Sequence, residues 1–233
     1  AVSGKSGKCN VVLSRPASAV FFDIVAGMDS AFYVDSGHSC LVDKLGEKIA
    51  FEELSVYDDA RAAQGLGSTP FDDEGYPTIE TVIIEKGRLQ SYLHNSLTSK
   101  KYKTKSTANA GWIVPHAWNI IVKEGGLTED ELLKEVKEGL YVNNITYVRF
   151  QDYRKGDFSA ITRDGVFKIE NGAITRAVKG LRLSDNIIHM LQNITNLSKD
   201  AKQVSHWWME FGTPSVMTPL ILCRNLGFTV PMK

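Results

Sequence analysis

Histidine, cysteine and carboxylate side chains carry much of protein chemistry, and this sequence places few of them at useful spacings. A zinc site needs ligands that converge, usually two histidines on one helix face and a third donor elsewhere. The five histidines are isolated from one another along the chain: His38, His94, His116, His189 and His206. The sequence therefore predicts no metal site within this chain.

Nucleophilic and nucleotide-binding motifs are also incomplete. His38 and Cys40 lie two residues apart, but a catalytic cysteine-histidine pair needs a third group to orient it. The segment Gly4–Ser6 lacks the first glycine of a phosphate loop, which lies six residues before the lysine. Gly65 and Gly67 are followed by Pro70 where a dinucleotide site needs a third glycine. We expect neither a cysteine hydrolase nor a nucleotide site.

An acidic turn and a tryptophan pair remain as candidates for binding. Asp72, Asp73 and Glu74 lie in a glycine-ended turn that could hold a cation or the amino terminus of a peptide, or could simply be solvated. Trp207 and Trp208 would face opposite sides of a strand, which leaves at least one indole available to a partner. These five residues are our candidate contacts for a peptide or a partner protein.

Length and composition indicate a globular protein without a strong electrostatic preference. The 233 residues are 43% hydrophobic, and 27 basic residues balance 27 acidic ones. A neutral chain has no overall field that attracts nucleic acid or an anionic membrane. The longest nearly apolar stretch, 17–28, is too short to cross a bilayer. Three widely spaced cysteines and an opening segment without an apolar run favour reduced thiols and a cytoplasmic location.

Three helices are expected from apolar periodicity and end signals. The first spans about 15–28, with Pro16 in its first turn, and follows a short strand at 10–13. The second begins at the capping-box pattern Thr128 to Glu131 and ends by Gly139. The third spans 184–197, and loops with short strands fill 35–73.

Strands account for most of the rest. Hairpins are expected at 78–84 with 89–93, and at 166–170 with 173–178 around Asn171-Gly172, which readily takes positive φ at both turn positions. Further strands are expected at 112–122, 140–150, 204–211, 216–223 and 226–230. The predicted class is α+β, with a large mainly antiparallel sheet or distorted barrel and a few flanking helices.

The order of several short segments along the chain resembles the TldD/PmbA family. The segments are 68–78, 82–89, 92–93, 106–110, 156–159, 169–174, 178–180 and 213–215. Each is weak alone, but their combination is specific and extends over about 10–230. Family members are roughly twice this size, and the similarity is to their C-terminal half. The resemblance implies a flexible segment at 1–9 and a single C-terminal domain at 10–233, without the family's N-terminal domain.

Family members are described as candidate modulators of DNA gyrase and as a heterodimeric zinc protease that processes peptides. The resemblance places a His-Glu-x-x-x-His motif of the catalytic TldD subunit on the first helix, where this chain has Phe22, Asp23 and Gly27. Phenylalanine and glycine cannot bind zinc through a side chain. We therefore expect this chain to be zinc-free and inactive alone, like the PmbA or TldE subunit. Cys223 is not assigned the role of the catalytic subunit's C-terminal cysteine.

The implied function is that of a non-catalytic subunit. It would pair with a TldD-like subunit that carries the zinc, or with a second copy of itself, and would help to form a channel for an extended peptide. An alternative from another class is a protein-interaction module that acts on DNA gyrase or another topoisomerase. An independent hydrolase with an unrecognised site is a third reading, which no linked nucleophile and base support.

Overall fold

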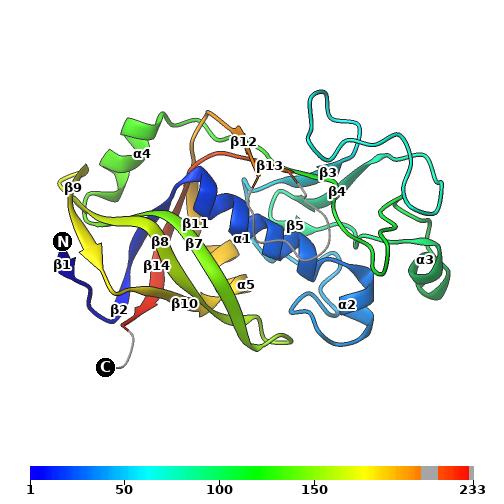
Figure 1. The fold of residues 1–233 in the computed structure, drawn as a ribbon, viewed down its shortest axis with the longest axis horizontal. Helices are drawn as coiled ribbons and strands as arrows, with labels where there is room; N and C mark the ends of the chain where they lie inside the picture. The colour runs from blue at the N-terminus through cyan, green and yellow to red at the C-terminus, as the bar shows by residue number, and fades with distance from the viewer. Residues whose placement is uncertain (206–214, 231–233) are drawn as a thin grey trace.

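The computed structural model describes residues 1–205 and 215–230, which form two β-sheets and five helices (Figure 1). Strands dominate and most neighbours in the sheets are antiparallel, which confirms the predicted α+β class. In the described residues, every helix is too short or too polar to cross a membrane.

The first sheet closes into a five-stranded barrel. Its strands follow the order β8–β10–β14–β2–β7, and β7 pairs again with β8. Strand β2 runs parallel to β7, and the other barrel pairs are antiparallel. The bounds are β2 Gly7–Leu13, β7 Gly139–Asp152, β8 Asp157–Glu170, β10 Arg182–Asn186 and β14 Ile221–Thr229. Short additions extend it: β1 Val2–Ser3, β9 Ala173–Lys179 and β11 Ile194–Leu197.

The second sheet has six strands, in the order β12–β13–β6–β3–β4–β5. The strands are β3 Val56–Asp59, β4 Glu80–Glu85, β5 Arg88–Leu89, β6 Asn119–Val122, β12 Lys202–Val204 and β13 Ser215–Thr218. Long loops leave this sheet, and they occupy the right-hand side of Figure 1.

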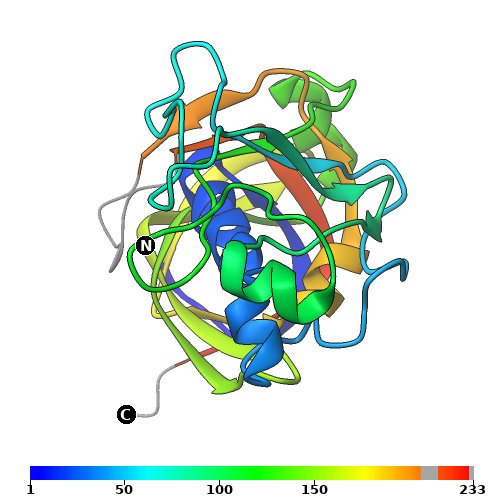
Figure 2. The ribbon, with the colours of Figure 1, turned by 90° about the vertical axis from the view of Figure 1, so that its right-hand side faces the viewer.

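Helix α1, Arg15–Met28, connects the two sheets and contacts strands of both (Figures 1 and 2). Pro16 lies in the first turn, as expected, and the helix has the predicted bounds. Its buried face joins a single hydrophobic core that includes Val142 of the barrel and Ile120 of the second sheet. This helix therefore positions any site formed where the barrel meets the second sheet.

Local sequence signals identified several other elements. Thr128 and Glu131 form the expected reciprocal capping box at the start of α4, Glu129–Val136. Asn171 and Gly172 have φ values of 52° and 76° in the turn that joins β8 to β9. The hairpin predicted at 78–93 is also present, although β5 is only two residues long.

The structure corrects three of the predicted elements. The strands expected at 216–223 and 226–230 are divided elsewhere, because β13 ends at Thr218 and β14 continues from Ile221 to Thr229. Helix α5, Ile187–Asn193, is shorter than the helix expected at 184–197 because Arg182–Asn186 pairs with β8 and Ile194–Leu197 pairs with β14. The strand expected at 112–122 exists only as β6, since 112–118 forms an irregular loop in which Trp112 is 95% exposed. Two helices were not expected: α2 Ala31–Asp35 and α3 Ser96–Tyr102.

Candidate functional site around helix α1

The positions that the resemblance aligns with the zinc motif of the catalytic subunit lie on α1, and Phe22 and Gly27 face different surroundings. Phe22 is 0% exposed and packs edge-to-face on Phe21, with ring centroids 5.4 Å apart. Gly27 is exposed, and a Cβ atom built on it would meet nothing within 4 Å. Positions five residues apart on an α-helix differ by about 140° in direction. In this chain position 22 therefore lies in the core and position 27 opens to the surface.

The other side chains that could bind a metal do not form a zinc site in the described residues either. Among residues 1–205 and 215–230, no three histidine, cysteine, aspartate or glutamate side chains are grouped so that they could hold a metal ion. Cys223 is fully buried in β14 between Val11 of β2 and Ile194 of β11, and burial raises the pKa of its thiol. A thiol kept protonated in an apolar core is a poor zinc ligand. The described residues of this chain do not fit a bound zinc ion.

A buried carboxylate lies at the C-terminal end of α1. Asp29 caps the helix with its backbone, its N–H approaching the carbonyl oxygens of Val25 and Ala26 at 3.1 Å. Its side chain is 0% exposed, and neither carboxylate oxygen has a hydrogen-bond partner. Burial, with a smaller contribution from the nearby charge of Asp58, raises the pKa of Asp29 well above its usual value.

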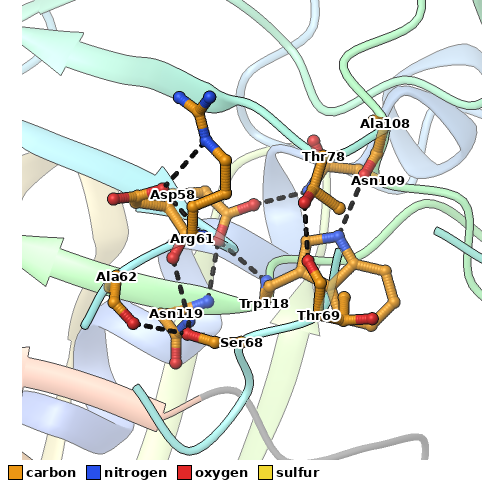
Figure 3. A network of polar contacts seen from close by, with 11 residues as sticks. Asp58, Arg61, Ala62, Ser68, Thr69, Thr78, Ala108, Asn109, Trp118 and Asn119 are labelled. Atoms are coloured by element: carbon orange, nitrogen blue, oxygen red, sulfur yellow. Dashed lines mark hydrogen bonds and ion pairs between the residues drawn. The ribbon is translucent and has the colours of Figure 1, made fainter. Parts of the chain in front are cut away.

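Asp58 in β3 is the centre of a polar network on the second sheet (Figure 3). It is 1% exposed, and its carboxylate accepts the backbone N–H groups of Trp118 at 2.8 Å and Asn119 at 2.9 Å. The side-chain amide of Asn109 donates to its other oxygen at 2.5 Å. Burial raises the pKa of Asp58 to about 7, because these hydrogen bonds offset only part of the desolvation.

The network continues through Asn119 and holds two loops against the sheet. The Asn119 side chain donates to Ser68 Oγ and to the Asp59 carbonyl, and it accepts the N–H of Gly67. Gly67 is required there, since a Cβ atom would lie 2.0 Å from the Trp118 carbonyl oxygen. The segments 60–78 and 108–118 are thereby held together.

The acidic turn is built around an inward-facing side chain. Asp72 is buried, and its carboxylate accepts the backbone N–H groups of Glu74, Tyr76 and Ala110. Glu74 accepts both the N–H and the hydroxyl of Ser96 at the start of α3, and Asp73 is exposed.

Of the five predicted contact residues, the structure thus leaves Asp73 and Glu74 on the surface and turns the Asp72 carboxylate inward. Trp207 and Trp208 lie outside the described residues. The contact role of all five residues stays a prediction.

Sequence reasoning missed the buried residues Asp29, Asp58 and Asn109. Nothing in their sequence neighbourhoods marks an isolated aspartate as buried. The only signal was indirect, because Asn109 falls within the segment 106–110 that contributes to the family resemblance.

Comparisons with known proteins agree with the sequence resemblance. The model of one protein family, described as the PmbA/TldA metallopeptidase C-terminal domain, matches residues 6–230. A metalloprotease of Methanocaldococcus jannaschii is 34% identical over 202 residues, covering 83% of this chain and 44% of the relative. Metalloprotease PmbA of Escherichia coli is 30% identical over 204 residues, covering 85% and 43%. The chain therefore spans less than half the length of these curated relatives.

Solved structures share the fold. A Thermotoga maritima protein described as a candidate modulator of a DNA gyrase superposes with a TM-score of 0.84 at 29% identity, covering 97% of this chain and 51% of that one. TldE from Thermococcus kodakarensis gives a TM-score of 0.84 at 24% identity, covering 98% and 51%. At that identity, the TldE comparison shows the fold alone.

Proposed function

Because the chain belongs to the PmbA/TldD metallopeptidase family, we propose that it acts as a PmbA- or TldE-like subunit of a zinc-dependent peptide-processing complex, without being the catalytic subunit. The observation that carries this proposal is that the two histidine positions of the zinc motif on α1 are occupied by residues that cannot bind zinc through a side chain. Phe22 is part of the core and Gly27 has no side chain, so neither of these two motif positions offers a zinc ligand. In this proposal a TldD-like partner in the cytoplasm holds the zinc.

Among the described residues, the β12 edge of the second sheet supports a role in binding extended peptides. An extended peptide can add to a sheet edge through backbone hydrogen bonds, which makes recognition tolerant of sequence. The second sheet ends in β5 on one side, where residues 46–50 hydrogen-bond to the chain at 87–89, and in β12 on the other. Asp73 and Glu74 lie on a loop between β3 and β4 of the same sheet and could attract the amino terminus of such a peptide.

Co-expression with a TldD-like subunit from the same organism tests this proposal. The complex should co-purify, contain zinc in proportion to the TldD-like subunit, and cleave peptides in a chelator-sensitive way. A matched complex in which the partner's zinc-binding histidines are replaced should lose both zinc and activity. Stoichiometric zinc and chelator-sensitive peptide cleavage by this chain alone would refute the assignment.

A second candidate function rests on the description of the Thermotoga maritima relative as a candidate gyrase modulator. Under this alternative the chain contacts the topoisomerase protein rather than DNA, since its net charge is zero. Gyrase captured by the immobilised chain without added DNA, together with altered supercoiling activity, would favour the alternative. Absence of capture under conditions that retain the TldD-like subunit would favour the first proposal.

A further inference from the structure

Asp29 occupies a position that disfavours a negative charge for two separate reasons. It is 0% exposed and neither of its carboxylate oxygens has a partner, so ionisation would leave an uncompensated charge in the protein interior. It also terminates α1, and the C-terminal end of a helix carries a partial negative charge.

A second carboxylate and an amide oxygen share its surroundings. The Asp29 carbonyl accepts the N–H of Leu93, and the neighbouring His94 carbonyl accepts the N–H of Asn109. The amide of Asn109 in turn donates to Asp58, whose charge acts on Asp29. The Asn109 Oδ1 atom is buried and has no donor, like both oxygens of Asp29.

The other titratable groups in this region do not supply a compensating positive charge. Arg61 lies 4.0 Å from Asp59 and pairs with it on the exposed side of the network (Figure 3). Burial lowers the pKa of His94, and its Nδ1 contacts Thr98 Oγ1 at 3.1 Å.

Tyr92 and His116, two further titratable groups, contact backbone carbonyl oxygens. The hydroxyl of Tyr92, whose phenol senses the charge of Asp29, donates to the Leu41 carbonyl at 2.7 Å. His116 Nδ1 contacts the Ala117 carbonyl at 2.9 Å. Within residues 1–205 and 215–230, the hydrogen bonds and ion pairs thus give neither Asp29 nor Asp58 a cationic partner.

We propose that Asp29 and Asp58 form a proton-binding pair that makes the junction between α1 and the second sheet pH-sensitive. The folded chain holds a proton on Asp29, which removes the uncompensated charge from its buried carboxyl group. Loss of that proton places two charges in one buried region, and the segment 108–118, which hydrogen-bonds to Asp58, is the part that loosens. The raised pKa values of both carboxyl groups, with burial as their main cause, agree with this assignment.

The direction of the pH effect follows from these shifts. A carboxyl group whose pKa is raised on folding stabilises the folded state below its unfolded pKa of about 3.9, and that stabilisation is lost as the pH rises through the folded pKa. For this pair the loss should extend from about pH 4 to pH 7 and above. Where one more proton is bound in the folded state, the folding equilibrium constant falls about tenfold for each pH unit. The two groups titrate as a coupled pair, so the measured steps belong to both.

Asp29→Asn in the full chain tests the proposal, because asparagine has the shape of the protonated acid but cannot ionise. Urea unfolding of the wild type should show a folding constant that falls between pH 5 and pH 8.5. The Asp29→Asn variant should show a flatter profile and should be more stable than the wild type at pH 8. Asp72→Asn is the matched control: Asp72 is also buried but accepts three backbone N–H groups, so this variant should lose stability at pH 8.

Infrared spectroscopy supplies a readout that does not depend on the variant's stability. The wild type at pH 7 should show the C=O band of a protonated carboxyl group, and raising the pH should remove it. A wild type without this band at pH 7, or an Asp29→Asn variant less stable than the wild type at pH 8, would overturn the proposal. Stabilisation by calcium or magnesium in the wild type but not in Asp29→Asn would also overturn it, because a cation would then neutralise the pair.

Discussion

Replacing Phe22 by histidine restores a ligand residue at a motif position and tests whether that position still belongs to a metal site. Phe22 is 0% exposed inside the core that joins both sheets. Removing its buried apolar surface costs about 2 kcal/mol, and a buried imidazole without hydrogen-bond partners costs about 1–3 kcal/mol more. We therefore expect Phe22→His to lower the free energy of unfolding by about 4 kcal/mol. For a chain of this size that corresponds to a fall in Tm of about 12 °C.

Gly27→His provides the matched control on the same helix. Gly27 is exposed and has open space where a Cβ atom would lie, so the new side chain should point into solvent. Glycine inside a helix is unfavourable by nearly 1 kcal/mol relative to alanine, and histidine is less unfavourable. The stability of Gly27→His should thus stay within about 0.5 kcal/mol of the wild type.

Urea unfolding followed by circular dichroism at pH 7 measures both variants, and calorimetric titration with zinc measures metal binding. The triple variant Phe22→His, Asp23→Glu and Gly27→His should bind no stoichiometric zinc and cleave no peptide, since one histidine is buried and the other is exposed. A loss of less than 1 kcal/mol for Phe22→His would show that position 22 is not a core position. Zinc-dependent cleavage by the triple variant would show that a third ligand is already present.

Three further predictions test the surrounding structure. Thr128→Ala should remove the capping box of α4 and cost about 1 kcal/mol in urea unfolding, whereas an effect below 0.3 kcal/mol would show that the cap is not needed. Asp72→Ala should lower the free energy of unfolding by about 3 kcal/mol, because three backbone N–H groups lose their acceptor. Asp73→Ala, on the exposed side of the turn, should change the Tm very little. Equal effects of the two substitutions would contradict the inward placement of Asp72. Burial raises the pKa of the Cys40 thiol to about 11, and Cys223 is fully buried. Both thiols should therefore react with a disulfide reagent only when the chain unfolds. Rapid labelling in native buffer would contradict their burial.

Elements governed by local interactions could be predicted from neighbouring residues. Helix α1 has an apolar periodicity and an early proline, and α4 has a capping box formed by residues three apart. The β8–β9 turn depends on the ability of Asn171-Gly172 to take positive φ. In each case the stabilising contacts lie within a few residues of one another.

Elements that depend on distant partners could not be delimited in this way. The apolar pattern at 184–197 suits one continuous helix, but strands β8 and β14 pair with its two ends and shorten it to α5. Helix α3 was missed because its capping box uses Asn95 and Thr98 instead of the usual glutamate or glutamine at the third position.

In the candidate site, too, some features follow from residue type and others depend on tertiary packing. The residue types at Phe22 and Gly27 are enough to exclude zinc ligands there, because the ability to bind a metal is a property of the side chain itself. The burial of Asp29 and Asp58 depends instead on segments distant in the sequence: Leu93 hydrogen-bonds to the backbone of Asp29, and residues 109–119 hydrogen-bond to Asp58. Desolvation in that environment raises the pKa of both carboxyl groups, and no local pattern in the chain encodes it.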